Sequence, residues 1–455
     1  MGKNLNNVLF SVCSKQSCDP QILKLYKNSS SIERENLLKI EEINKANLLK
    51  AFSWVAGRTS LSSTSYSEVQ AFRMGEIPPS REERRQTPER NRARRQFLTS
   101  LERDRGDRVN FPSPLEALEV FTTDANNQGE CSSCSAFAVT AALETCVAKV
   151  IPNPAFRFAP PRGLSAQNML DCAFGNPGLF GCDGGQSFRY LTWLKDGTLD
   201  TNRQYPYLDS GVKFEGLNND YRTCYQSGAR ATAVMDESHS SWDDHTERDL
   251  ENILLDGHAI ITTMEVQEDF MFYKSGVYQS ASCQDWKLGV GRDAQWDEES
   301  GLRPLRHAVV IVGFGEERGG KYWKVKNSWG ENWGSSGFFK ILRKGSVHCG
   351  LGAYFSVALC KECGSQGDCK DRSQGSLKPA QRPPPNLPEE GIGAGFTSHL
   401  ATPLGGVGIS TCPSCANLSV CPRLIPCRTK SRNGRDKCCR VYGGSGYRLY
   451  CPSRC

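Results

Sequence analysis

The chain has 455 residues, enough for two or three domains, and its net charge of +6 is modest. It contains 21 cysteines, more than a cytosolic enzyme normally carries, so we expect it to work in an oxidising compartment. No run of 18 apolar residues occurs, and no membrane span is expected. The first residues do not have the pattern of a signal peptide, so we expect the printed N-terminus not to be the natural one.

The first quarter of the chain contains a predicted helix and an arginine-rich stretch. Residues 30–52 have apolar side chains at near-helical spacing, and Ser30 with Glu33 fits a capping box. Residues 78–108 hold ten arginines and six acidic residues with almost no apolar ones, so we expect this stretch to be flexible. Within it, Arg92-Ala93-Arg94-Arg95 resembles a furin-type cleavage site, although an ordinary solvated arginine run explains it equally well.

Residues 126–150 carry the strongest catalytic candidate. Gln128 lies six residues before Cys134, which opens a run, residues 136–150, that is apolar almost all round and predicts a buried helix. At a helix N-terminus, unsatisfied N–H groups and the helix dipole favour a thiolate. Cys131, three residues upstream, can hold this loop by a disulfide.

The residues up to about 209 are predicted to be mainly helical, and residues 229–359 mainly β-structure. Strands are predicted at 259–261, 307–314, 321–326 and 337–342. His307 opens the second of these strands, and Asn327 directly follows the third. The charged stretch 284–306 is interpreted as an inserted surface loop that either restricts access to a cleft or has no function.

The C-terminal part is predicted to be a linker followed by a small module. Residues 378–411 are rich in proline and glycine. Residues 411–455 hold eight cysteines and nine Lys or Arg against one acid, which predicts a disulfide-rich unit. Its charge favours binding of acidic glycans, with simple solubility as the alternative, and nucleic acid is not expected in an oxidising compartment.

Zinc is the weaker explanation for two cysteine pairs, Cys360 with Cys363 and Cys412 with Cys415. The pairs are far apart and no histidine lies at metal spacing, so disulfides are favoured there. Neither a metal nor another cofactor is therefore expected.

Five motifs resemble, in order, those of papain-like cysteine peptidases. They are Asn126 to Phe137, Leu164 to Gln167, Gly181 to Gly185, Arg306 to Gly315 and Tyr322 to Gly330. The resemblance covers about residues 126–357 and is closest in places to cathepsins B and C. It implies an α+β fold with a helical lobe and a β-barrel-like lobe, the latter followed by the small disulfide-rich module. It also implies a lysosomal or extracellular peptidase acting on proteins or peptides.

The resemblance assigns a role to each catalytic candidate. Cys134 is the nucleophile, His307 holds and delivers the proton, and Asn327 orients the imidazole ring. Gln128 and the backbone N–H of Cys134 form the oxyanion hole. The implied substrate-binding residues are Gly184, Gly185, Ser133, Ala308, Trp329, Thr263 and Tyr354.

The family pattern implies the disulfides Cys131–Cys182, Cys172–Cys224 and Cys283–Cys349, and we interpret Cys146 as a free core thiol. Ser132 stands where relatives usually have glycine, and Ser135 where they usually have an aromatic residue. The adjacent histidines of cathepsin B are absent, so an endopeptidase is expected. The alternative function is a secreted matrix or binding protein, inactive or weakly active, built on a peptidase scaffold.

The expected domains are a pro-segment at 1–108, a peptidase domain at 109–359, a linker at 360–411 and the basic module at 412–455. The pro-segment interpretation depends on Asn36, Ile40 and Asn44, and on Trp54 and Gly75, which resemble features of the family's pro-regions. Such a segment lies across the cleft until it is removed, so the chain is expected to be a zymogen. An unrelated helical region is the alternative.

Overall fold

The computed structural model describes residues 29–77, 79, 83, 88–103, 122–150, 163–195, 199–208, 224, 233–241, 245–283, 285–286, 306–317, 320–343, 347–362, 439–443 and 446–450. The predicted linker at 378–411 lies outside these residues. From the basic module, only the hairpin of β12 (Cys439–Gly443) and β13 (Gly446–Tyr450) is described. No helix in the described ranges is long and apolar enough to cross a membrane.

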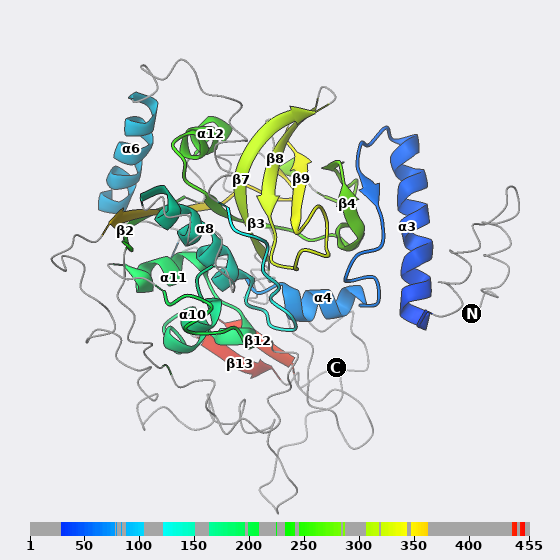
Figure 1. Cartoon of the computed structure of the whole chain (residues 1–455), viewed down its shortest axis with the longest axis horizontal. Coiled ribbons are helices and arrows are strands. Elements are labelled where there is room, and N and C mark those ends of the chain that lie inside the picture. The colour runs from blue at the N-terminus through cyan, green and yellow to red at the C-terminus, as the bar shows by residue number, and fades with distance from the viewer. Residues whose placement is uncertain are drawn as a thin grey trace, which may run out of the picture.

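The helix α8 (Cys134–Val150) is the centre of the first lobe. Every residue from Cys134 to Ala148 is buried, because most of its side chains are small or apolar and the charged Glu144 is paired with Lys326. The helices α10 (Ala166–Cys172) and α11 (Ser187–Leu194) pack against it, and a large sheet packs against it from the second lobe (Figure 1).

The second lobe is built on a seven-stranded sheet with the order β2-β11-β3-β7-β8-β9-β5. Its strands are β2 (Ala233–Ser241), β3 (Ile260–Met264), β5 (Val277–Tyr278), β7 (His307–Glu317), β8 (Gly320–Lys326), β9 (Phe338–Leu342) and β11 (Phe355–Glu362). All neighbours are antiparallel except β5 and β9. The helix α12 (Glu247–Leu255), which begins with a capping box, packs on β3 and β7. The four predicted strands are therefore present, and the α+β fold is confirmed.

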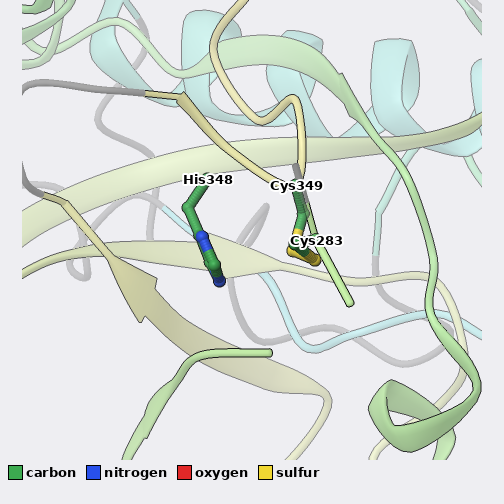
Figure 2. Close-up of side chains that lie close together, drawn as sticks. All are labelled: Cys283, His348 and Cys349. Atoms are coloured by element: carbon green, nitrogen blue, oxygen red, sulfur yellow. A yellow bond between two sulfur atoms is a disulfide. The ribbon is translucent and has the colours of Figure 1, made fainter. Parts of the chain in front are cut away.

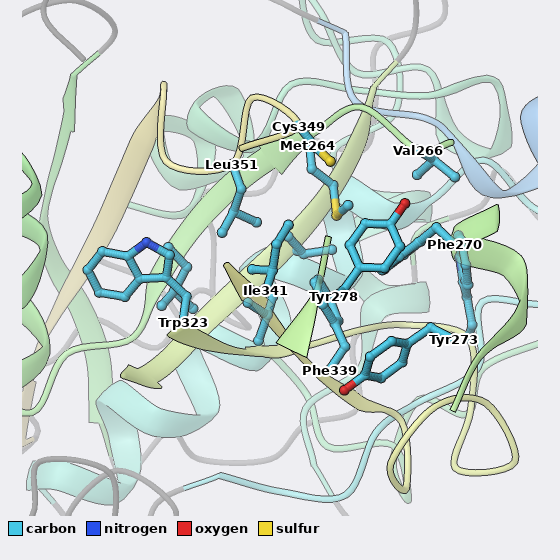
Figure 3. Packing of buried hydrophobic residues seen from close by; sticks show 14 of the residues in the cluster. Met264, Val266, Phe270, Tyr273, Tyr278, Trp323, Phe339, Ile341, Cys349 and Leu351 are labelled. Atoms are coloured by element: carbon cyan, nitrogen blue, oxygen red, sulfur yellow. The ribbon is translucent and has the colours of Figure 1, made fainter. Parts of the chain in front are cut away.

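A cluster of aromatic side chains fills the core of the second lobe (Figure 3). Phe270, in the 3-10 turn η4 (Glu268–Phe272), lies at its centre with its ring centroid 4.9 Å from that of Tyr278 and 4.8 Å from that of Phe339. Edge-to-face contacts of this kind add to the stabilisation that burial of each large ring provides. The cluster gives β7 and β8 a rigid support beneath the candidate site.

Residues 29–77, which we call the N-terminal arm, pack on this aromatic core. The arm consists of α3 (Ser31–Leu49), β1 (Val55–Ala56) and α4 (Tyr66–Arg73), and β1 pairs with β4 (Tyr273–Ser275). Trp54 is buried against Tyr273 and Tyr278, and its Nε1 donates to the Gln279 carbonyl at 2.7 Å.

Two asparagines of α3 hold the arm together. Asn44 binds both backbone groups of Ala56, with Nδ2 donating to the carbonyl at 2.9 Å and Oδ1 accepting from the N–H at 2.9 Å. Asn36 donates to the carbonyls of Ser62 and Thr64, each at 3.0 Å. The predicted helix is thus present, with Ser30 accepting from the Glu33 N–H at its start.

The expectation of a flexible stretch at 78–108 is wrong for residues 88–103, which form the helix α6 (Pro88–Arg103). Phe97, Leu98 and Leu101 share one helical face, and this face packs on the second lobe. Phe97 stacks on His239 with 4.4 Å between ring centroids. Arg94, from the furin-like sequence, is buried and donates to Ser241 Oγ at 2.9 Å, so that sequence lies on a docked helix.

Cys146 is not a free thiol, which corrects the interpretation from sequence. It forms a disulfide with Cys360, joining α8 to β11 across the two lobes. The three bonds implied by the resemblance, Cys131–Cys182, Cys172–Cys224 and Cys283–Cys349, are also present. Cysteine pairing across 214 residues depends on tertiary structure, which no local pattern reveals.

The potential ligands Cys283, His348 and Cys349 lie close together (Figure 2). The two sulfurs are bonded to each other and are therefore not thiolate ligands for a metal. His348 Nε2 accepts from the Ser280 N–H at 3.1 Å, which gives this histidine a structural role. Nearby, β6 (Asp285–Trp286) pairs with β10 (Val347–His348), and residues 284 and 287–305 of the predicted inserted loop lie outside the described residues.

Candidate active site

The sequence candidates meet where the two lobes touch. Cys134 begins α8, His307 begins β7, and Asn327 directly follows β8. Because β7 and β8 are neighbours in the sheet, His307 Nε2 lies 2.7 Å from Asn327 Oδ1. The N–H of Ala308, the residue after His307, donates to the Cys134 sulfur at 3.3 Å. The thiol, the imidazole and the amide are thus brought together from three elements of the fold.

The ring of Trp329 covers the imidazole. It stacks on His307 with 4.8 Å between ring centroids and an interplanar angle of 28°. Both residues are buried, so water has little access to the His307–Asn327 hydrogen bond. A hydrogen bond shielded in this way is electrostatically stronger than one in water. Trp329 therefore fixes both the position of the imidazole and its surroundings.

Gln128 is held rigidly beside the cysteine loop. Its Nε2 donates to the Cys131 carbonyl at 2.7 Å, and its Oε1 accepts from Ser328 Oγ at 2.7 Å. Nε2 carries two hydrogens, and one remains available to a ligand. The N–H groups in the first turn of α8, that of Cys134 included, have no intrahelical acceptor. Both kinds of donor suit a developing oxyanion.

Residues 74–77, which we call the cleft segment, cover the thiol. The Gly75 N–H donates to the Cys134 sulfur at 3.1 Å. Gly185 donates its N–H to the Gly75 carbonyl at 2.8 Å and accepts from the Ile77 N–H at 2.8 Å. The backbone of Gly185 thus holds the extended cleft segment in place.

Close approach of the backbones explains two glycines. A Cβ on Gly75 would lie 1.6 Å from the Ser132 carbonyl oxygen, so only glycine fits there. A Cβ on Gly184 would lie 2.7 Å from the Gly75 carbonyl oxygen, and Gly184 has φ of 108°. With Gly75 in this position, the cleft segment presents an N–H donor to the Cys134 sulfur, whereas a thiolate attacks a carbonyl carbon.

In this covered state the thiol and the imidazole are both neutral. Burial raises the pKa of Cys134 to about 12, and the hydrogen bond from Ala308 only partly offsets this effect. Burial lowers the pKa of His307 to about 4, against a smaller opposing effect of the Asn327 hydrogen bond. The thiolate expected at the start of α8 is therefore not favoured while the cleft segment excludes water.

The remaining substrate-binding candidates from the sequence differ in their contacts. Thr263 and Ala308 are buried partners across β3 and β7, and Tyr354 is buried with its hydroxyl bonded to Ser356. Ser133 Oγ instead contacts Tyr207 Oη at 3.3 Å and the Cys131 carbonyl at 3.4 Å.

The two serines that depart from the family pattern are both buried. Ser132 Oγ donates to the Ala71 carbonyl at 2.9 Å, so it helps to hold the end of α4 over the cleft. Ser135 Oγ has no hydrogen-bond partner among the described residues and lies 3.2 Å from a Cβ built on Gly185.

One residue of the site, Glu76, could not be found from sequence. Its side chain is buried and accepts hydrogen bonds from Ser187. A single glutamate after Gly75 looks like any solvated loop residue, and no local pattern indicates that it enters a cleft.

The family model described as papain family cysteine protease matches residues 116–359. Pro-cathepsin H of Bos taurus is 35% identical over 244 residues, which are 52% of this chain and 61% of that protein. A cathepsin L-like proteinase of Fasciola hepatica is 30% identical over 239 residues, 52% of this chain and 62% of that protein. The matches thus span about three fifths of these relatives.

Solved structures share the fold. Digestive procathepsin L2 from the larval midgut of Tenebrio molitor superimposes with a TM-score of 0.54 at 24% identity, over 78% of this chain and 98% of that one. A second procathepsin from the same source, L 3, has a TM-score of 0.52 at 22% identity, over 79% of this chain and 100% of that one.

Proposed function

Since the chain belongs to the papain family of cysteine proteases, we propose that it hydrolyses peptide bonds with Cys134 as nucleophile and His307 as general base and acid. The observation that supports this most is the His307–Asn327 hydrogen bond of 2.7 Å beside the Cys134 sulfur. It fixes the imidazole so that Nδ1, the other ring nitrogen, is available to the thiol.

The proposed reaction has two steps. The Cys134 thiolate attacks the carbonyl carbon, and His307 delivers its proton to the leaving amine, which leaves an acyl-enzyme. Water, deprotonated by His307, then hydrolyses the thioester and releases the free thiol. Gln128 Nε2 and the Cys134 N–H bind the oxyanion in both steps. With no adjacent histidines in the chain, we propose an endopeptidase.

We further propose that the chain is made as an inactive zymogen, with residues 1–108 as its pro-segment. Support comes from the cleft segment, whose Gly75 lies on the Cys134 sulfur, and from the neutral thiol beneath it. Activation then requires cleavage between about Arg81 and Asn110 and departure of the arm. A lysosomal or extracellular location suits the disulfides.

Labelling by a papain-class epoxide inhibitor tests the activity. Cleaved protein should hydrolyse peptides under reducing conditions and react with the epoxide at Cys134, whereas Cys134→Ala should do neither and melt at the same temperature. The uncut chain should be nearly inactive. Equal turnover by Cys134→Ala would refute the mechanism. A wild-type protein that neither reacts nor cleaves would support the alternative, a binding protein on a peptidase scaffold.

A separate proposal concerns the basic tail. Residues 411–455 carry nine Lys or Arg against one acid, which favours an acidic glycan as ligand. The full-length chain should elute from heparin at higher salt than a chain ending at Leu377. Identical elution would refute glycan binding by the tail.

A further inference from the structure

Glu76 is a buried carboxyl group without a cationic partner. The backbone around Glu76 is held on two sides. Glu76 exchanges two hydrogen bonds of 2.9 Å with Arg306, and its neighbours Gly75 and Ile77 bind Gly185. Its side chain is only 1% exposed. Among the described residues it forms no ion pair, and the Arg306 guanidinium is directed at Glu265, 3.5 Å away.

The partner of the Glu76 side chain is the first residue of α11. Glu76 Oε1 and Oε2 lie 3.0 and 3.2 Å from the Ser187 backbone nitrogen, and Oε2 lies 2.6 Å from Ser187 Oγ. The Tyr354 hydroxyl is hydrogen-bonded to the backbone of Phe188, the next residue of the same helix. Burial raises the pKa of both Tyr354 and Tyr190, and the nearby Glu76 adds a smaller effect in the same direction.

This pocket is polar but uncharged. Ser187 supplies two donors to the Glu76 carboxyl group, while no described cation compensates a negative charge there. A carboxylate is expensive to bury in such surroundings, whereas a neutral acid or an amide is not. Accordingly, burial raises the pKa of Glu76 to about 8, against the opposing effect of the Ser187 hydrogen bonds.

The pocket is part of the site described above. Gly75 lies on the Cys134 sulfur, and Glu76 is its neighbour along an extended chain held by Gly185. Glu76 follows Gly75 towards the C-terminus, and the arm presents an N–H to the sulfur. A substrate must present a carbonyl carbon there instead, so it runs past Gly185 in the opposite direction, and its next residue towards the N-terminus takes the position of Glu76. The side chain of that residue has the same pocket available, once the arm has left.

We propose that this pocket selects a glutamine or a protonated glutamate side chain at the second residue before the cleaved bond. The proposal depends on the peptidase activity proposed above, and it adds the substrate class. Ser187 is the specificity residue, because its N–H and hydroxyl both bind the side-chain carbonyl oxygen. Glu76 occupies the pocket in the uncut chain and is the neutral acid that the pocket accepts.

Three peptides that differ only at the second residue before the cleaved bond, which is Gln, Glu or Leu, test the proposal on the cleaved enzyme. At pH 4 to 5 we expect kcat/KM for the Gln peptide to exceed that for Leu at least tenfold. The Glu peptide should match Gln near pH 4. Its kcat/KM should then fall relative to Gln by about tenfold per pH unit between 5 and 7, because only the protonated acid enters the pocket.

Ser187→Ala provides the matched variant. The ratio of kcat/KM for Gln to that for Leu should fall about tenfold, since the variant removes one donor. Thr192→Ala, an exposed position on the same helix, should leave this ratio unchanged. Melting temperatures of both variants show whether the helix is intact.

A preference for Leu, or a Glu-to-Gln ratio independent of pH, would overturn the pocket assignment and leave the peptidase proposal in place. Absence of cleavage of all three peptides, together with absence of epoxide labelling at Cys134, would overturn the proposed function and the pocket with it.

Discussion

The closed state of the cleft is predicted to weaken as pH rises, and Glu76→Gln should remove this dependence. The pKa of Glu76 is raised from 4.5 to about 8 when the cleft segment is docked. A raised pKa means that the docked state prefers the protonated acid, so docking is tightest below pH 4.5 and weakens as pH rises towards 8. The change corresponds to roughly 3 kcal/mol at pH 7, a factor of a few hundred in the docking equilibrium.

The assay is the rate at which a small alkylating reagent labels Cys134 in the uncut chain. The sulfur is 0% exposed under Gly75, so labelling reports undocking of the cleft segment. Dividing the wild-type rate by the Glu76→Gln rate at each pH cancels the reactivity of the thiol itself. The ratio should be constant below pH 4.5 and rise by up to tenfold per unit towards pH 8. A ratio that is flat from pH 4 to 8 would refute the neutral-pocket reasoning.

Three further predictions concern the supports of the cleft. Asn44→Ala removes both hydrogen bonds to Ala56 and should weaken docking of the arm by about 2 kcal/mol. Labelling of Cys134 should then be roughly thirtyfold faster, whereas Lys45→Ala, at an exposed position, should leave the rate unchanged. Burial lowers the pKa of His239 and His258, which lie beneath α6, so protonation of these histidines on acidification should loosen this helix. The protection of α6 amides against hydrogen exchange should fall about tenfold from pH 7 to 5, whereas that of α3 amides should not. Replacing Cys146 and Cys360 together by alanine should lower the free energy of unfolding by about 3–5 kcal/mol in urea titrations, and an unchanged value would exclude the bond as a stabiliser.

Local patterns were sufficient to predict most of the scaffold. The run at residues 136–150 is long and apolar almost all round, which predicts a buried helix, and the shorter run that begins at His307 predicts a strand. The grouping of thiol, imidazole and amide was implied by the family resemblance. The helix α6 was missed because its charges outweighed a real signal, the stripe of Phe97, Leu98 and Leu101. Charged helices of this kind are stable only when their apolar stripe finds a surface, which is tertiary information.

The role of Glu76 could not be predicted for a different reason. Glu76 is buried because of the path of the cleft segment, which is extended and irregular, and because the start of α11, more than 100 residues away in sequence, lies against it. Backbone hydrogen bonds from Gly185 and Arg306 fix that path, and they are invisible in the sequence. The neutral state of Cys134 was missed for the same reason, because a covering segment reverses the electrostatic effect of the helix N-terminus.

The bond between Cys146 and Cys360 sets the aperture of the cleft. It fastens the C-terminal part of the helix that carries the nucleophile to β11 of the opposite lobe, so it opposes separation of the two walls. Room for a ligand arises only when the single strand of the arm withdraws. Under the proposed function, a substrate enters this space as a single extended stretch of chain, as the cleft segment does. Susceptibility to cleavage would thus be governed by the local unfolding of the target as much as by its sequence.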